Sequence, residues 1–164
     1  MVSVALYAII FYRARLYADM GLQVLYFVLA VYGWWAWLHG GKARGELEVS
    51  RASSRTRGVL VLLAGLGGVV LGQSLARFTD ASLPFMDSIL TAFSLAAQWM
   101  QTRKLLECWL VWLAVDVCYV GLFSYKELYL TAGLYAVFLV LAGMGFAEWR
   151  RSMGAGPSAM PGAA

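Results

Sequence analysis

The sequence predicts an all-α integral membrane protein with about six closely spaced transmembrane helices. Hydrophobic residues make up 62% of the 164 residues and charged residues only 13%, about half of the ~25% that is typical of soluble domains. Apolar stretches of helix length follow one another along the chain, and most approach the roughly 20 residues that cross a bilayer core. These stretches are nearly unbroken, which favours helices over barrel strands, where polar and apolar residues alternate.

The apolar segments differ in their polar content. In chain order, they cover residues 2–12, 20–38, 58–76, 83–101, 105–125 and 128–147. The first is too short to span a bilayer unaided. The second, third and sixth carry no charge, whereas the fourth contains Asp87 and the fifth contains Glu107 and Asp116. The two cysteines have no zinc-type spacing, so we expect neither a metal nor a cofactor.

The basic residues between the segments predict the orientation in the membrane. The smaller set consists of Arg13, Arg15, Arg77 and Lys126. The larger set consists of Lys42, Arg44, Arg51, Arg55, Arg57, Arg103, Lys104, Arg150 and Arg151. The positive-inside rule places the larger set in the cytoplasm, together with the C-terminus. Membrane topology explains the net charge of +4 better than a nucleic-acid partner does.

An internal repeat relates the two ends of the chain. At an offset of 112 residues, Tyr7, Phe11, Gly21, Gly33 and Trp37 recur as Tyr119, Phe123, Gly133, Gly145 and Trp149. We therefore expect one transmembrane domain over residues 1–151, with an incomplete first repeat at 2–38, a linking helix at 58–76 and a second repeat at 83–149. Residues 152–164 are expected to form a disordered cytoplasmic tail. The parent architecture would have seven helices in parallel three-helix repeats, and we expect this chain to lack the first of them.

Two stretches carry a resemblance to a known family. The sequence FYRARLYADMGLQVLYFVLAVYGWWAWL and the later TAFSLAAQWMQTRKLLECWLVWLAVDVCYVGLF resemble PnuC-type nicotinamide riboside transporters. The resemblance implies a three-plus-one-plus-three fold similar to SWEET transporters. It also implies facilitated diffusion of nicotinamide riboside into the bacterial cytoplasm across the inner membrane. A cytosolic riboside kinase would then trap the substrate for NAD biosynthesis. Related branches carry thiamine, riboflavin or deoxynucleosides, so these substrates stay open.

A cationic pyridinium ring and a ribose require aromatic faces and hydrogen-bonding groups inside the bundle. Asp87, Thr91, Ser94 and Gln98 share one face of the fourth segment. They predict either a polar pathway or ordinary interhelical packing, since Ser and Thr are common at such interfaces. Gln98, with donors and an acceptor, is the best candidate for a carboxamide or ribose contact.

The fifth segment places Trp109, Trp112, Asp116 and Tyr119 on one face. A carboxylate at the centre of a spanning helix costs about 2.5–3.5 kcal/mol on insertion scales unless it has a partner or water. Asp116 is therefore expected to face the substrate's cation or its hydroxyls, with a structural hydrogen bond as the alternative. Trp112 would stack on the ring or pack in the core, and Trp109 would line the site or anchor the helix at the interface.

In the second segment, Gln23 and Tyr26 share a face and are expected to line the pathway. Trp34, near the cytoplasmic end, is a candidate inner gate. An intramembrane enzyme is disfavoured because the chain has one histidine and no pair of central acids. A non-transporting scaffold is the other alternative, and the sequence leaves the oligomeric state open, a homo-oligomer included.

Overall fold

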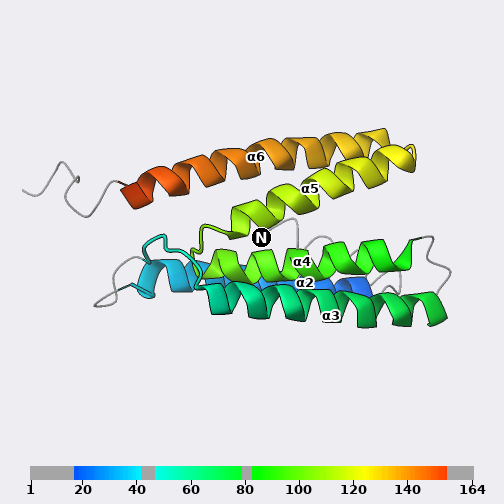
Figure 1. Ribbon diagram of the computed structural model, residues 1–164, viewed down its shortest axis with the longest axis horizontal. Helices are drawn as coiled ribbons and strands as arrows, with labels where there is room; N and C mark the ends of the chain where they lie inside the picture. The colour runs from blue at the N-terminus through cyan, green and yellow to red at the C-terminus, as the bar shows by residue number, and fades with distance from the viewer. Residues whose placement is uncertain (1–16, 42–46, 79–82, 155–164) are drawn as a thin grey trace, which may run out of the picture. The chain divides into compact units, whose positions relative to one another are not determined.

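The computed structural model describes residues 17–41, 47–78 and 83–154, with backbone only for 17–24. These residues form helices α2 (Tyr17–His39), α3 (Ser54–Phe78), α4 (Pro84–Thr102), α5 (Cys108–Tyr125) and α6 (Tyr129–Gly154) (Figure 1). Within the described ranges, β pairing is confined to a single bridge between Ser50 and Leu105. The all-α prediction is therefore confirmed.

The second to sixth predicted segments each become one helix, and the boundaries shift for local reasons. The fifth helix begins at Cys108, later than predicted, because residues 103–107 form a turn in which Lys104 has a φ of 48°. The sixth helix continues past the predicted end at Ala147 to Gly154, so residues 152–154 of the predicted tail are helical. Segment 2–12 lies outside the described residues, as do residues 155–164.

Helices α3, α5 and α6 are long and apolar enough to cross a membrane, with mean hydropathies of 2.1, 1.6 and 2.0. Helix α3 shows this most clearly, since it buries only Ala64, Gly68 and Gly72. Its exposed surface carries many large apolar side chains, and Val61 and Val70 among them are 58% and 67% exposed. Exposing that apolar area to water would cost free energy in proportion to its extent. Exposing it to the hydrocarbon of a lipid bilayer would not. The chain is a helical integral membrane protein.

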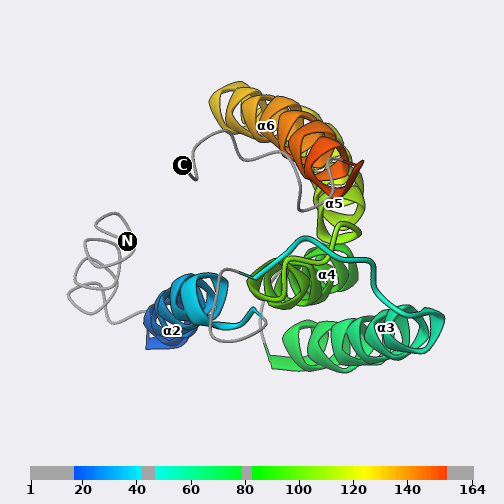
Figure 2. The ribbon, with the colours of Figure 1, turned by 90° about the vertical axis from the view of Figure 1, so that its left-hand side faces the viewer.

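The chain divides into two compact units, residues 1–48 and 49–164. The first unit contains α2. In the second, α4 contacts both α3 and α5, and α5 also contacts α6. Figures 1 and 2 show these four helices following one another in a row. Neighbouring helices of this unit run in opposite directions, as expected for consecutive membrane spans (Figure 1).

A hydrogen-bonded clasp fixes the start of α3 beside the turn between α4 and α5. The Ser50 N–H donates to the Lys104 carbonyl at 3.0 Å, and the Leu106 N–H donates to the Ser50 carbonyl at 2.9 Å. The Ala52 N–H donates to Oε2 of Glu107 at 2.8 Å. Ser53 then caps α3, because its Oγ accepts from the Thr56 N–H at 3.1 Å. The start of α3 is thus tied to the turn that precedes α5.

Glycine permits the close approach of α3 to α4. A Cβ at Gly68 would lie 2.8 Å from the Cα of Ile89, and one at Gly72 would lie 3.0 Å from the Cα of Phe85. Small residues let helix backbones approach where no hydrophobic force drives association, as in lipid. Because the obstacle is backbone, neither contact can be relieved by moving a side chain alone.

Replacing Gly68 by valine should therefore separate α3 from α4. We expect a loss of stability of about 1–3 kcal/mol, the usual cost of overpacking, and a lower unfolding temperature of the purified protein in detergent. Gly67→Val is the matched control, because a Cβ at Gly67 meets nothing within 4 Å. Equal unfolding temperatures for the two variants would contradict the close packing at Gly68.

Candidate functional site

Asp116 lies on the face of α5 that is turned toward α6. Trp109, Asp116 and Phe123 are spaced by seven residues and therefore share one side of the helix. Trp109 packs edge-on against Trp149 of α6, with ring centroids 5.2 Å apart, and Phe123 stacks on Tyr135 of α6 at 5.3 Å. Asp116 lies between these two contacts and is only 3% exposed.

No hydrogen bond to the Asp116 carboxylate is found within the part of the chain that the structure describes. A buried acid without a partner is costly in a membrane-spanning helix, and such residues typically mark substrate or ion pathways. The position predicted from the sequence, buried and central in its helix, is found. Its role in binding stays a prediction.

An aromatic cluster lies beside Asp116 on the α5–α6 seam. Tyr119 and Tyr135 have ring centroids 4.6 Å apart, and Tyr119 also stacks on Phe123 at 5.7 Å. On its other side, Tyr119 packs against the core of Leu90, Val115 and Leu122 between α4 and α5. The cluster thus joins three helices of the second unit and offers flat faces one turn from the carboxylate.

The two tryptophans of the predicted face have different surroundings. Trp109 packs against Gly145, where an added Cβ would lie 2.5 Å from the indole ring, and its buried Nε1 has no partner among the described residues. Trp112 instead donates from Nε1 to Oε1 of Gln101 at 3.1 Å. Trp109 therefore holds α5 against α6, while Trp112 links α5 to the end of α4.

The polar stripe on α4 is less uniform than its sequence spacing suggests. Ser94 is buried, but its Oγ donates to the Leu90 carbonyl of its own helix at 2.9 Å. This intrahelical bond uses the hydroxyl proton, as expected for a packing role. Thr91 and Gln98 are partly buried, whereas Asp87 in the first turn is exposed. The stripe is therefore at least partly buried in the bundle only from Thr91 onward, and Asp87 lies outside the buried part.

The remaining predicted residues belong to the first unit. Tyr26 is partly buried and Trp34 is 61% exposed. The side chain of Gln23 lies outside the described residues. The pathway role of Gln23 and Tyr26, and the gate role of Trp34, stay predictions.

Two contacts were missed from the sequence. Gln101, three residues beyond Gln98, accepts the indole hydrogen bond of Trp112. Glu107 binds the backbone of Ala52, 55 positions away along the chain. The spacing of Gln98 and Gln101 could have suggested the first, because both lie within one helical turn. Nothing local to either partner indicates the second.

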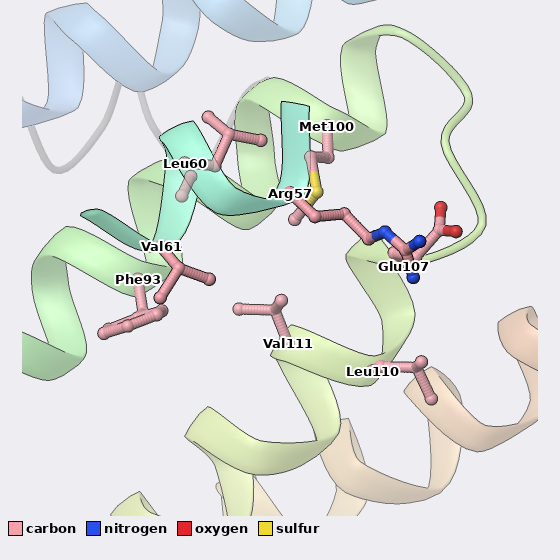
Figure 3. Close-up of a pocket in the computed structure, with 9 residues that line it drawn as sticks. Arg57, Leu60, Val61, Phe93, Met100, Glu107, Leu110 and Val111 are labelled. Atoms are coloured by element: carbon pink, nitrogen blue, oxygen red, sulfur yellow. The ribbon is translucent and has the colours of Figure 1, made fainter. Parts of the chain in front are cut away.

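A separate pocket of about 220 Å³ lies between α3, α4 and α5. Its lining residues are Arg57, Leu60, Val61, Phe93, Ala96, Met100, Glu107, Leu110 and Val111 (Figure 3). None of the predicted substrate-binding residues lines it. It is also smaller than the roughly 300–1,000 Å³ of typical small-molecule sites. We therefore do not assign the substrate to this pocket.

The chain is similar in sequence to known membrane transporters. The sequence model of the family described as nicotinamide mononucleotide transporter matches residues 1–151. The nicotinamide riboside transporter PnuC of Escherichia coli strain K12 is 28% identical over 178 residues, covering 93% of this chain and 74% of the relative. The riboflavin/roseoflavin transporter RibM of Streptomyces davaonensis is 28% identical over 142 residues, covering 84% of this chain and 66% of the relative.

A solved structure has the same fold. The crystal structure of the vitamin B3 transporter PnuC matches with a TM-score of 0.63 and 24% sequence identity. The match covers 92% of this chain and 68% of that one. At this identity the likeness extends to the fold alone, and it agrees with the helical membrane architecture described above.

Proposed function

Because the chain belongs to the nicotinamide mononucleotide transporter family, we propose that it carries nicotinamide riboside across the membrane by facilitated diffusion. The observation that carries this proposal is the match over almost the whole chain to relatives that are themselves transporters. The substrate is taken from the E. coli relative, which is named a nicotinamide riboside transporter. We propose the bacterial inner membrane as its location, with the C-terminus and a riboside kinase in the cytoplasm.

The α5 face supports this substrate chemically. Nicotinamide riboside carries a positive charge on a flat ring, and the buried Asp116 carboxylate would offset that charge. Trp112 and Tyr119 would supply aromatic faces, on which a cation is stabilised by roughly 0.5–2 kcal/mol. Within the second unit, Trp109, Thr91, Ser94 and Gln98 complete the proposed lining from α5 and α4. In the first unit, Gln23 and Tyr26 are proposed to line the pathway. Trp34 would act as the gate.

Riboflavin is the second candidate substrate, because one relative is named a riboflavin/roseoflavin transporter. Its ring system is flat but uncharged, so it would need the aromatic faces more than the carboxylate. By the same criterion, thiamine, which is cationic, would need the carboxylate, and deoxynucleosides, which are neutral, would need it less. A non-transporting scaffold would need neither the aromatic faces nor the carboxylate.

Uptake into proteoliposomes tests the proposal. With the membrane potential held at zero, we expect labelled nicotinamide riboside to enter until the inside and outside concentrations are equal. Collapsing a proton or sodium concentration gradient should change the initial rate of uptake by less than about twofold. A passive carrier does not couple the movement of its substrate to that of an ion. Unlabelled riboside should compete more strongly than riboflavin. Absence of uptake where the E. coli relative is active would favour the scaffold. Accumulation above the outside concentration at zero membrane potential would exclude facilitated diffusion.

A further inference from the structure

The pocket between α3, α4 and α5 has one polar end and one apolar end. Arg57 and Glu107 lie together at one end, away from Val61 and Phe93 (Figure 3). Both charged residues are near the start of their elements, since α3 begins at Ser54 and α5 at Cys108. Val61 and Val111 each follow four residues later, about 6 Å deeper along their helices at 1.5 Å per residue. The pocket thus becomes apolar toward the membrane interior.

Its charged groups retain unused hydrogen-bonding capacity. Arg57 donates from Nη2 to Ser54 Oγ at 3.1 Å, and a guanidinium has five N–H donors in total. Glu107 accepts the Ala52 N–H on Oε2, which leaves Oε1 for another donor. No ion pair joins Arg57 to Glu107 in the part of the chain that the structure covers. The pocket therefore presents one cation and one anion side by side.

We propose that this pocket binds a phospholipid whose headgroup carries both a phosphate and a primary amine, as in phosphatidylethanolamine. The phosphate would lie on Arg57, since guanidinium groups bind phosphate in a two-pronged geometry. The ammonium group would donate to Oε1 of Glu107. Part of one acyl chain would fill the apolar end between Val61, Phe93 and Val111.

The charge pattern favours this lipid over the alternatives. A purely anionic headgroup would satisfy Arg57 but bring a second negative charge toward Glu107. A choline headgroup carries the right charges but has no N–H to donate. None of the residues proposed to bind the riboside lines this pocket, so the lipid proposal does not depend on the transport proposal.

Native mass spectrometry of the purified protein, mixed with defined lipids, tests the proposal without any transport substrate. We expect phosphatidylethanolamine to be retained more than phosphatidylglycerol or phosphatidylcholine of the same chain length. Arg57→Gln should reduce its retention roughly fivefold or more, because the charge-assisted contact to phosphate is lost. Glu107→Gln, which keeps an acceptor for Ala52, should abolish the preference over phosphatidylglycerol.

Arg55→Gln is the matched control, because Arg55 lies on the same helix, is exposed and does not line the pocket. Should Arg57→Gln fail to fold, Val61→Trp tests the apolar end with both charges intact and should also displace the lipid. Equal retention of the three lipids by the wild type would overturn the proposal. Equal losses of phosphatidylethanolamine in the Arg55→Gln and Arg57→Gln variants would also overturn it. The same holds if the protein forms oligomers that cover this pocket and retain no lipid.

Discussion

Replacing Asp116 by asparagine is expected to weaken nicotinamide riboside binding roughly 10- to 100-fold, because a hydrogen bond or contact to a charged group contributes about 1.5–3 kcal/mol. Asparagine preserves the size of the side chain, removes its charge and replaces one acceptor oxygen with an amide donor. The carboxylate is 3% exposed and lies between two aromatic contacts to α6. A charge in that position is screened little by water or salt, so its removal should be felt in full.

The effect should depend on the charge of the substrate. The reduced, dihydropyridine form of the riboside has the same ribose and carboxamide but no positive charge. The wild type should prefer the oxidised form, and the Asp116→Asn variant should bind the two forms about equally. A variant that loses both forms to the same extent would indicate that Asp116 has a structural role and does not pair with the cation.

Binding by isothermal titration calorimetry, together with proteoliposome uptake, measures this difference. Asp87→Asn is the control, because Asp87 is an acid on α4 that is exposed in the first turn. It should leave binding within about twofold of the wild type, as surface substitutions usually do. Unchanged binding in the Asp116 variant would refute the proposed site.

The helices could be predicted from the sequence because the membrane imposes one rule on every spanning segment. All backbone polar groups must be satisfied within the segment, so an apolar run of sufficient length becomes a helix. This rule predicted both ends of α2 to α5, and the start of α6, to within a few residues. It could not place the turn at residues 103–107, where the clasp with Ser50 and Ala52 decides the backbone. Nor could it predict that α6 continues into the polar sequence up to Gly154.

The candidate site was predictable only in part. Helical periodicity alone places Trp109, Asp116 and Tyr119 on one side of α5, and in the structure Trp109 and Tyr119 contact α6 from that side. Periodicity cannot show what each polar atom binds. Ser94 donates within its own helix, and Trp112 donates to Gln101, a residue for which no role was predicted. Such pairings depend on the axial offset between helices, which the sequence does not encode locally.

Replacing Trp112 by alanine is expected to weaken riboside binding about tenfold, because it removes an aromatic face worth roughly 0.5–2 kcal/mol toward a cation. It also removes the indole donor to Gln101. The two losses have different consequences. Loss of the ring weakens the contact with the substrate, whereas loss of the hydrogen bond weakens the attachment of α5 to the end of α4.

Trp112→Phe and Gln101→Met separate these contributions. Phenylalanine keeps a flat ring but cannot donate, and methionine keeps the approximate length of Gln101 but cannot accept through an amide oxygen. If the ring binds the substrate, Trp112→Phe and Gln101→Met should both stay within about threefold of the wild type in riboside affinity. If the hydrogen bond is what matters, both variants should match Trp112→Ala.

Because Asp116 and Trp112 are four residues apart on α5, they are neighbours on one helix face. Stacking on Trp112 would therefore bring the cationic ring beside the carboxylate, and the Asp116→Asn, Trp112→Ala double variant should lose less than the product of the two single losses.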